Sequence, residues 1–122
     1  MHTAAAPPLL VACLCAAWCR TCDAYGPVLD QVLDLLQAQG IPVQGRWIDV
    51  EDEADLLGEL DIQTFPTLVV LLGDALRFAG PVTPQPETLQ RLLKSLLEGG
   101  GAVAAEPAVA DFTQRLLQDP RR

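Results

Sequence analysis

A run of apolar residues leads directly into two closely spaced cysteines, and this junction constrains the fold more than any other feature. Residues 9–17 are apolar and predict a buried strand, and a helical pattern follows Cys22. A strand that passes straight into a helix places Cys19 at the helix N-terminus. The unpaired N–H groups and the helix dipole favour a thiolate there. Because a thiolate beside a second thiol can exchange disulfides, we predict redox chemistry at Cys19 and Cys22.

The rest of the chain alternates between strand and helix patterns. The elements predicted, in chain order, are a strand at 9–15, a helix at 19–39, a strand at 43–50, a helix at 52–60, strands at 68–72 and 76–79, and a helix at 86–97. Strands joined by a crossover helix should be parallel, whereas the final hairpin should be antiparallel. The expected fold class is α/β, a four-stranded mixed sheet in the order β-α-β-α-β-β-α with helices on both faces.

The C-terminal part of the chain differs from the rest in composition. Residues 99–105 are rich in Gly and Ala, so we predict a domain at 1–98, a linker at 99–106 and a helical tail at 107–122. The tail carries apolar residues on one helical face, namely Val109, Phe112, Leu116 and Leu117. Packing against its own domain is the favoured expectation, and binding to a partner or a second copy is the alternative.

Charge and hydropathy restrict the partners and the compartment. The chain of 122 residues is half hydrophobic and has a net charge of −8, which argues against nucleic acid and anionic membrane surfaces. No run reaches the roughly 20 apolar residues of a membrane span. No Lys or Arg precedes the first apolar stretch, so export is not expected. We therefore expect a cytoplasmic protein, where a CxxC pair is more often catalytic than structural.

Four features together resemble the thioredoxin family over roughly residues 9–98. They are Trp18-Cys19-x-x-Cys22 after a strand, Pro27 five residues later, Phe65-Pro66-Thr67 before a buried strand, and the Gly73-Asp74 hairpin followed by Gly80. The resemblance implies the thioredoxin fold and a protein disulfide oxidoreductase with no bound cofactor. It also implies that the peptide bond before Pro66 is cis.

The resemblance further implies a role for each site residue. Cys19 is expected to attack a substrate disulfide and Cys22 to resolve the mixed disulfide. Trp18 is expected to form part of the apolar rim that receives the substrate, and the backbone of Phe65, in the Phe65-Pro66-Thr67 segment, to pair with it like an added strand. The implied partners are protein disulfides, with a thioredoxin reductase or glutathione as electron donor. A monomer is expected, and a dimer through the tail remains open.

Two positions depart from the thioredoxin pattern. Arg20-Thr21 replaces the usual Gly-Pro between the cysteines, and the positive charge of Arg20 should favour the Cys19 thiolate and make the couple less reducing. Cys13 stands where thioredoxins carry a buried Asp. It is either a third thiol able to exchange with Cys22 or, together with Cys15 on the same strand face, a buried core cysteine. The second interpretation is favoured because free cysteines are among the most buried residues.

The chain also departs from full thioredoxins in having no extra N-terminal strand and helix, so one sheet edge is expected to be bare unless residues 107–118 cover it.

The same residues allow two alternatives to a cofactor-free oxidoreductase. Four cysteines can bind zinc or an iron–sulfur cluster, but these lie on one strand and one helix start, so no metal site is expected in a monomer. A cluster shared by two copies remains open. The second alternative is a non-catalytic thioredoxin-fold module that binds a partner through the C-terminal helix or through the acidic stretch at residues 49–61. That stretch more simply predicts a solvated helix.

Overall fold

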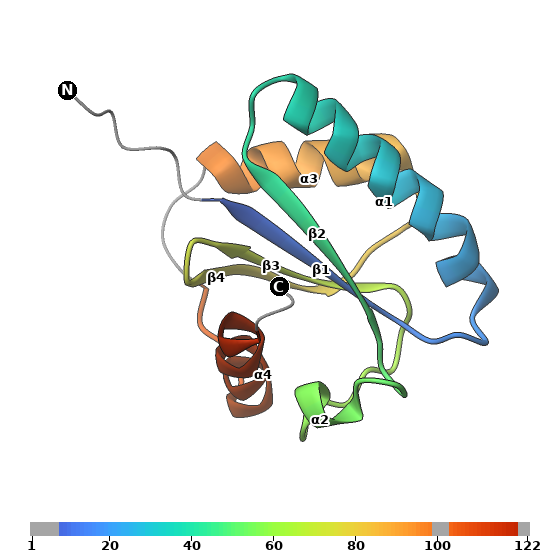
Figure 1. The fold of residues 1–122 in the computed structure, drawn as a ribbon, viewed down its shortest axis with the longest axis vertical. Coiled ribbons are helices and arrows are strands. Elements are labelled where there is room, and N and C mark those ends of the chain that lie inside the picture. Colours follow the sequence, from blue (N-terminus) through green and yellow to red (C-terminus); the bar gives the residue numbers. More distant parts are fainter. Residues whose placement is uncertain (1–7, 99–102, 120–122) are drawn as a thin grey trace.

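The architecture is a single mixed sheet between two layers of helices. The computed structural model describes residues 8–98 and 103–119. Its elements are β1 (Leu9–Cys15), α1 (Arg20–Ala38), β2 (Val43–Asp49), α2 (Ala54–Leu57), β3 (Thr67–Leu72), β4 (Ala75–Pro81), α3 (Pro86–Glu98) and α4 (Pro107–Gln118). The sheet order is β2-β1-β3-β4. β1 pairs parallel with β2 and antiparallel with β3, and β3 pairs antiparallel with β4. The predicted four-stranded mixed sheet and element order are confirmed (Figure 1).

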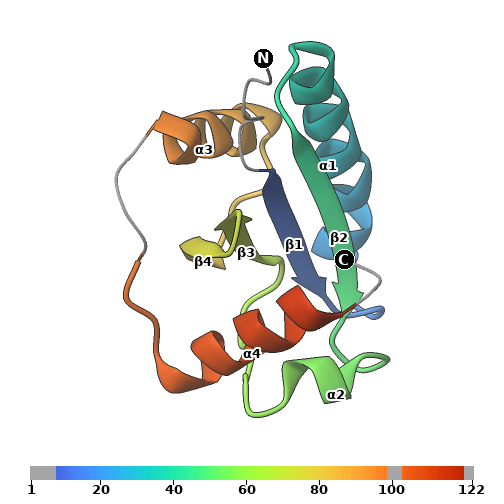
Figure 2. The same cartoon turned by 60° about the vertical axis from the view of Figure 1, so that its left-hand side comes forward.

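Helices α1 and α3 cover one face of the sheet, and α2 and α4 cover the other (Figures 1 and 2). β1 is buried along its whole length because both of its faces meet a helical layer. Its alternate side chains divide between two core clusters. Leu9, Val11, Cys13 and Cys15 face α1 and α3, and Leu10, Ala12 and Leu14 face α2 and α4. The long apolar run in the sequence is thus a strand covered on both sides.

The C-terminal helix α4 completes the second of these clusters. Phe112 and Leu116 are fully buried there against β1 and β3 side chains. The tail therefore packs on its own domain, as favoured from the sequence. It covers a face of the sheet rather than the edge considered from the sequence, and β2 and β4 are the outer strands of the described sheet. Residues 99–102 of the predicted linker lie outside the described residues, and the division at 98 and 106 stays a prediction.

Gly40 ends α1, as the sequence indicated. Its φ is +83°, a conformation that suits glycine. The backbone N–H of Gly40 donates to the carbonyl of Gln37 at 2.9 Å, and that of Ile41 donates to the carbonyl of Leu36 at 3.0 Å. This pair of bonds satisfies carbonyls that the helix end leaves open and turns the chain toward β2.

The helix predicted over 52–60 is shorter than expected, because α2 ends at Leu57. Gly58 has a φ of +59°, which takes the backbone out of the helical region. The open carbonyls of Leu56 and Leu57 accept hydrogen bonds from the Arg115 guanidinium on α4, at 2.7 and 2.8 Å. The end of α2 is thus set by a contact with α4 that a local sequence pattern does not contain.

We predict that Arg115→Ala lowers the free energy of unfolding by about 1–3 kcal/mol, because it leaves two partly buried carbonyls without their charged donor. Urea denaturation measures the change. Arg91→Ala is the matched control, since Arg91 is an exposed arginine on α3. Equal effects of the two substitutions would contradict the prediction.

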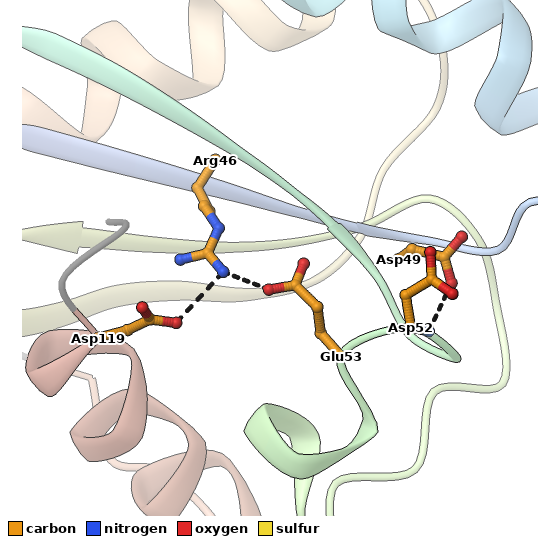
Figure 3. Close-up of polar contacts among 5 residues, drawn as sticks. All are labelled: Arg46, Asp49, Asp52, Glu53 and Asp119. Atoms are coloured by element: carbon orange, nitrogen blue, oxygen red, sulfur yellow. Dashed lines mark hydrogen bonds and ion pairs between the residues drawn. The ribbon is translucent and has the colours of Figure 1, made fainter.

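A buried ion-pair cluster joins β2, α2 and α4. The Arg46 side chain on β2 is only 8 % exposed, and its guanidinium forms two ion pairs (Figure 3). One is with Glu53, just before α2, and the other is with Asp119, just after α4, at a distance of 3.3 Å. The Asp49 carboxylate accepts the backbone N–H groups of Glu51 and Asp52 at 2.9 and 3.1 Å. Part of the acidic stretch therefore serves the fold rather than a partner surface.

Candidate functional site

The cysteines gather where β1 ends and α1 begins. Cys19 is the N-cap residue of α1, with φ −87° and ψ 115°, and its side chain makes no capping hydrogen bond. A turn closed by the Cys19 N–H and the Ala16 carbonyl at 3.0 Å connects the strand to the helix. The thiol of Cys19 is free and half-buried. The predicted placement of this cysteine at a helix N-terminus is confirmed, and its role as attacking thiol stays a prediction.

The sulfur of Cys22 is bonded to Cys15 rather than to Cys19. Cys22 lies in the first turn of α1 and is 1 % exposed, and its Cα is 5.9 Å from that of Cys15 at the end of β1. Cys15 is buried in the core, as the favoured interpretation expected, but it is not a free thiol, because the strand end meets the first turn of the helix closely enough for a bond. Sequence spacing singled out Cys22 but missed Cys15 as its partner.

Cys13 extends this cluster into the core. Its sulfur lies 3.7 Å from that of Cys15, and its thiol is free and fully buried. Burial raises the pKa of the Cys13 thiol to about 12, so it is protonated at neutral pH. Tyr25 on α1 is also fully buried, and its hydroxyl has no hydrogen-bond partner among the described residues. Burial raises the pKa of Tyr25, and the negative charge that Cys13 carries once it has lost its proton raises it further.

We predict that Cys13 makes stability depend on alkaline pH. The thiol keeps its proton to about pH 12 in the native state, whereas its ordinary pKa is 9.0. The unfolded chain therefore binds fewer protons between these values, and the free energy of unfolding falls as pH rises through this window. Urea denaturation should show that the free energy of unfolding of the wild type falls between pH 8 and pH 11. This fall should exceed the fall in Cys13→Ala by about 2–3 kcal/mol. The same slope in both proteins would contradict the prediction.

Trp18 and the segment before β3 lie beside the cysteines. The Trp18 side chain is 68 % exposed and contacts the Phe65 ring edge-to-face, with centroids 5.6 Å apart. The Phe65–Pro66 peptide bond is cis, as the resemblance implied. Thr67 starts β3 opposite Leu14 and donates its hydroxyl to the Thr64 carbonyl at 2.6 Å. The strand pairing thus brings Phe65-Pro66-Thr67 to the end of β1, and Trp18 and Phe65 form an apolar surface there.

Arg20 and a groove complete the surroundings of the site. Arg20 is the exposed first residue of α1. A groove of about 700 Å³ runs between α1 and β2 and is lined by Cys22, Trp47 and acidic side chains of α1. Within residues 8–98 and 103–119, no three His, Cys, Asp or Glu side chains lie close enough to hold a metal ion. None of the helices described there has the length and apolar character to cross a membrane.

The chain matches a known protein family over most of its length. The family model described as Thioredoxin matches residues 3–95. The chain belongs to the thioredoxin family. Its sheet, its helical layers and its cis peptide bond before β3 are those of a thioredoxin fold with an added C-terminal helix.

Individual relatives agree with this assignment. A thioredoxin from Chlorobaculum thiosulfatiphilum is 28 % identical over 58 residues, which cover 48 % of this chain and 51 % of that protein. The match thus spans about half the length of this curated thioredoxin. The structure of chloroplastic thioredoxin z is 26 % identical, with a TM-score of 0.62 over 76 % of this chain and 81 % of that one. A thioredoxin from Halobacterium salinarum, 21 % identical, has a TM-score of 0.61 over 77 % and 79 % of the two chains and supports the fold alone.

Proposed function

We propose that this thioredoxin-family protein is an oxidoreductase that exchanges disulfides with protein substrates through Cys19 and Cys22. The observation that carries the proposal is the pair of sulfurs at the start of α1. One is the free, half-buried thiol of Cys19 at the helix N-terminus, and the other is the buried sulfur of Cys22 one turn later, which is oxidised in the structure, in a disulfide with Cys15. Family membership supports redox chemistry of this pair.

The reaction follows from the environments of the two sulfurs. The Cys19 thiolate attacks one sulfur of a substrate disulfide, a mixed disulfide forms, and the other substrate sulfur leaves as a thiolate. The step that follows needs Cys22 in its reduced form, after the electron donor has reduced the Cys15–Cys22 bond to two thiols. The Cys22 thiolate then attacks the Cys19 sulfur, which releases the second substrate thiol and leaves a Cys19–Cys22 disulfide. The helix N-terminus stabilises the charged form of Cys19, and the buried position of Cys22 keeps the resolving sulfur away from solvent.

The neighbouring surface suits an extended polypeptide. Trp18 and Phe65 offer exposed and half-buried apolar rings beside Cys19. In this proposal the substrate chain lies against these rings and pairs with the backbone at Phe65, next to Pro66, as an added strand. A thioredoxin reductase or glutathione supplies electrons, and the proposed compartment is the cytoplasm.

Reduction of insulin disulfides by dithiothreitol tests the proposal, because a protein disulfide oxidoreductase accelerates this reaction. We expect the purified protein to raise the rate above the blank. Absence of acceleration by the folded protein would overturn the proposal and favour a partner-binding module.

We predict that the couple formed by Cys19 and Cys22 is less reducing than thioredoxin, with a reduction potential above the thioredoxin value of about −270 mV. Arg20 is exposed and follows Cys19 directly in the chain, so its positive charge should stabilise the reduced form of the couple. Since exposed charges contribute up to about 1 kcal/mol, Arg20→Gln should lower the potential by about 10–20 mV. Equilibration in glutathione buffers measures both values. A wild-type potential at or below that of thioredoxin would refute the prediction.

A further inference from the structure

All four cysteines of the chain meet at one corner of the core, where α1 covers the sheet. Cys13 and Cys15 extend from the same face of β1, and both belong to the cluster of buried side chains that also contains Cys22. Cys19 packs against this cluster from its more exposed side. The site therefore holds two more sulfurs than the proposed exchange uses.

Cys22 stands between two possible partners. Its bond to Cys15 is the one observed, with the two Cα atoms 5.9 Å apart. Cys19 lies three positions before Cys22 at the start of the same helix, and residues at this spacing are neighbours on a helix surface. One buried sulfur can thus be reached from the core side by Cys15 and from the solvent side by Cys19.

We propose that Cys15 is a second, internal resolving thiol, which takes over the disulfide from Cys19–Cys22 and returns Cys19 to the free thiol state while the protein stays oxidised. The inference rests on the proposed function, because it starts from the disulfide that substrate reduction leaves behind.

The transfer is a thiol–disulfide exchange within one molecule. The Cys15 thiolate attacks the Cys22 sulfur, the Cys15–Cys22 bond forms, and the bond between Cys22 and Cys19 breaks. Cys19 leaves with the electron pair as a thiolate. Cys15 loses one proton before the attack and Cys19 can take one proton from solvent after it, so protons balance. The three cysteines that take part hold one disulfide and one thiol before and after the transfer, so no external oxidant is needed.

The two environments favour this direction of transfer. Cys15 is buried in an apolar cluster, where an uncharged disulfide is favoured over a charged thiolate. Cys19 is half-buried at the α1 N-terminus, where the leaving thiolate is stabilised. The Cys13 thiol, 3.7 Å from the Cys15 sulfur, can donate its S–H to Cys15 while that sulfur carries charge.

The transfer changes what the oxidised protein can do. With Cys22 bound to Cys15, a thiolate at Cys19 can attack a second disulfide, such as glutathione disulfide, and release one glutathione thiolate. Cys22 cannot resolve the resulting mixed disulfide, so it persists until an external thiol arrives. The oxidised protein therefore reacts as a single-thiol reagent at Cys19.

The sequence makes the experiment direct, because Arg20 lies between Cys19 and Cys22. Trypsin cleavage after Arg20 separates a peptide that contains Cys13, Cys15 and Cys19 from the peptide 21–46 that contains Cys22. Reduced protein is oxidised with glutathione disulfide, quenched in acid, alkylated and digested. In the wild type we expect the two peptides to be cross-linked, with fragmentation placing the bond at Cys15 and a glutathionyl or alkyl group at Cys19.

Variants identify the partner of Cys22. Cys15→Ala should keep a cross-link but carry it at Cys19, because the transfer then has no acceptor. Cys13→Ala is the matched control and should keep the bond at Cys15, because Cys13 is equally buried on the same strand face but is not the acceptor. Circular dichroism checks that each variant is folded. If the Cys15→Ala variant does not fold, fragmentation of the wild-type cross-link identifies the bonded residue.

The outcomes separate this inference from the proposed function. A wild type that accelerates insulin reduction but carries its cross-link only at Cys19, with Cys15 alkylated, overturns the inference and leaves the proposed function standing. Absence of any cross-link in folded Cys15→Ala also overturns it, because the transfer needs a Cys19–Cys22 disulfide to start from. A wild type that carries the Cys15–Cys22 bond but does not accelerate insulin reduction overturns both, and the bond is then a structural disulfide.

Discussion

Cys19→Ser is expected to lower the acceleration of insulin reduction by at least about 1000-fold, because a hydroxyl that is not ionised at neutral pH replaces the attacking thiolate. The other free thiol among the described residues, Cys13, is fully buried and protonated, so it cannot take over. Initial rates of insulin reduction with dithiothreitol, at equal concentrations of folded wild type and variant, measure the loss.

Cys22→Ser provides the contrast that assigns the two roles. It should also lose turnover, but it keeps Cys19 and therefore should accumulate a mixed disulfide with an insulin chain. A gel without reducing agent detects this covalent complex. Cys19→Ser should form none. A complex formed by Cys19→Ser and not by Cys22→Ser would exchange the proposed roles of the two cysteines.

Phe112→Ala is expected to lower the free energy of unfolding by about 3–5 kcal/mol, because the ring is fully buried between α4 and the sheet. Such a loss is a large part of the roughly 5–15 kcal/mol that stabilises a typical domain. Urea denaturation followed by circular dichroism measures it. The loss would show that α4 is part of the domain core rather than a helix held ready for a partner.

Val103→Ala is the control for this substitution. Val103 lies in the same C-terminal segment, but its side chain is exposed, so the change should stay within about 0.5 kcal/mol. Similar small effects for both variants would mean that α4 contributes little to stability. They would favour the alternative that its apolar face binds a partner or a second copy.

The fold could be predicted from the sequence because its elements are marked locally. The apolar run of β1, the turn at Gly73-Asp74 and the helical spacing in α1 and α3 each indicate one element without reference to distant residues. The length of α2 could not be predicted in this way. Its end depends on Arg115, which reaches it from α4 across most of the second half of the chain.

The site could be predicted in part for the same reason. The spacing of Cys19 and Cys22 and the strand-to-helix junction are local, and so is the segment around Pro66. The Cys15–Cys22 bond is not local. It depends on how closely the last residue of β1 approaches the first turn of α1, and this distance is set by the turn between them rather than by the cysteine spacing.

The position of α4 has a consequence for folding during synthesis. β1 is the first strand of the described sheet to be made, yet Leu10 and Leu14 share a core cluster with Phe112 and Leu116 of α4, which follows all four strands in the chain. Part of this face of the sheet, which α2 alone then covers, therefore stays open to water and to other nascent chains until α4 has been made. A ribosome stalled before residue 107 should hold a chain that exposes this part of the sheet, and synthesis of α4 should close it.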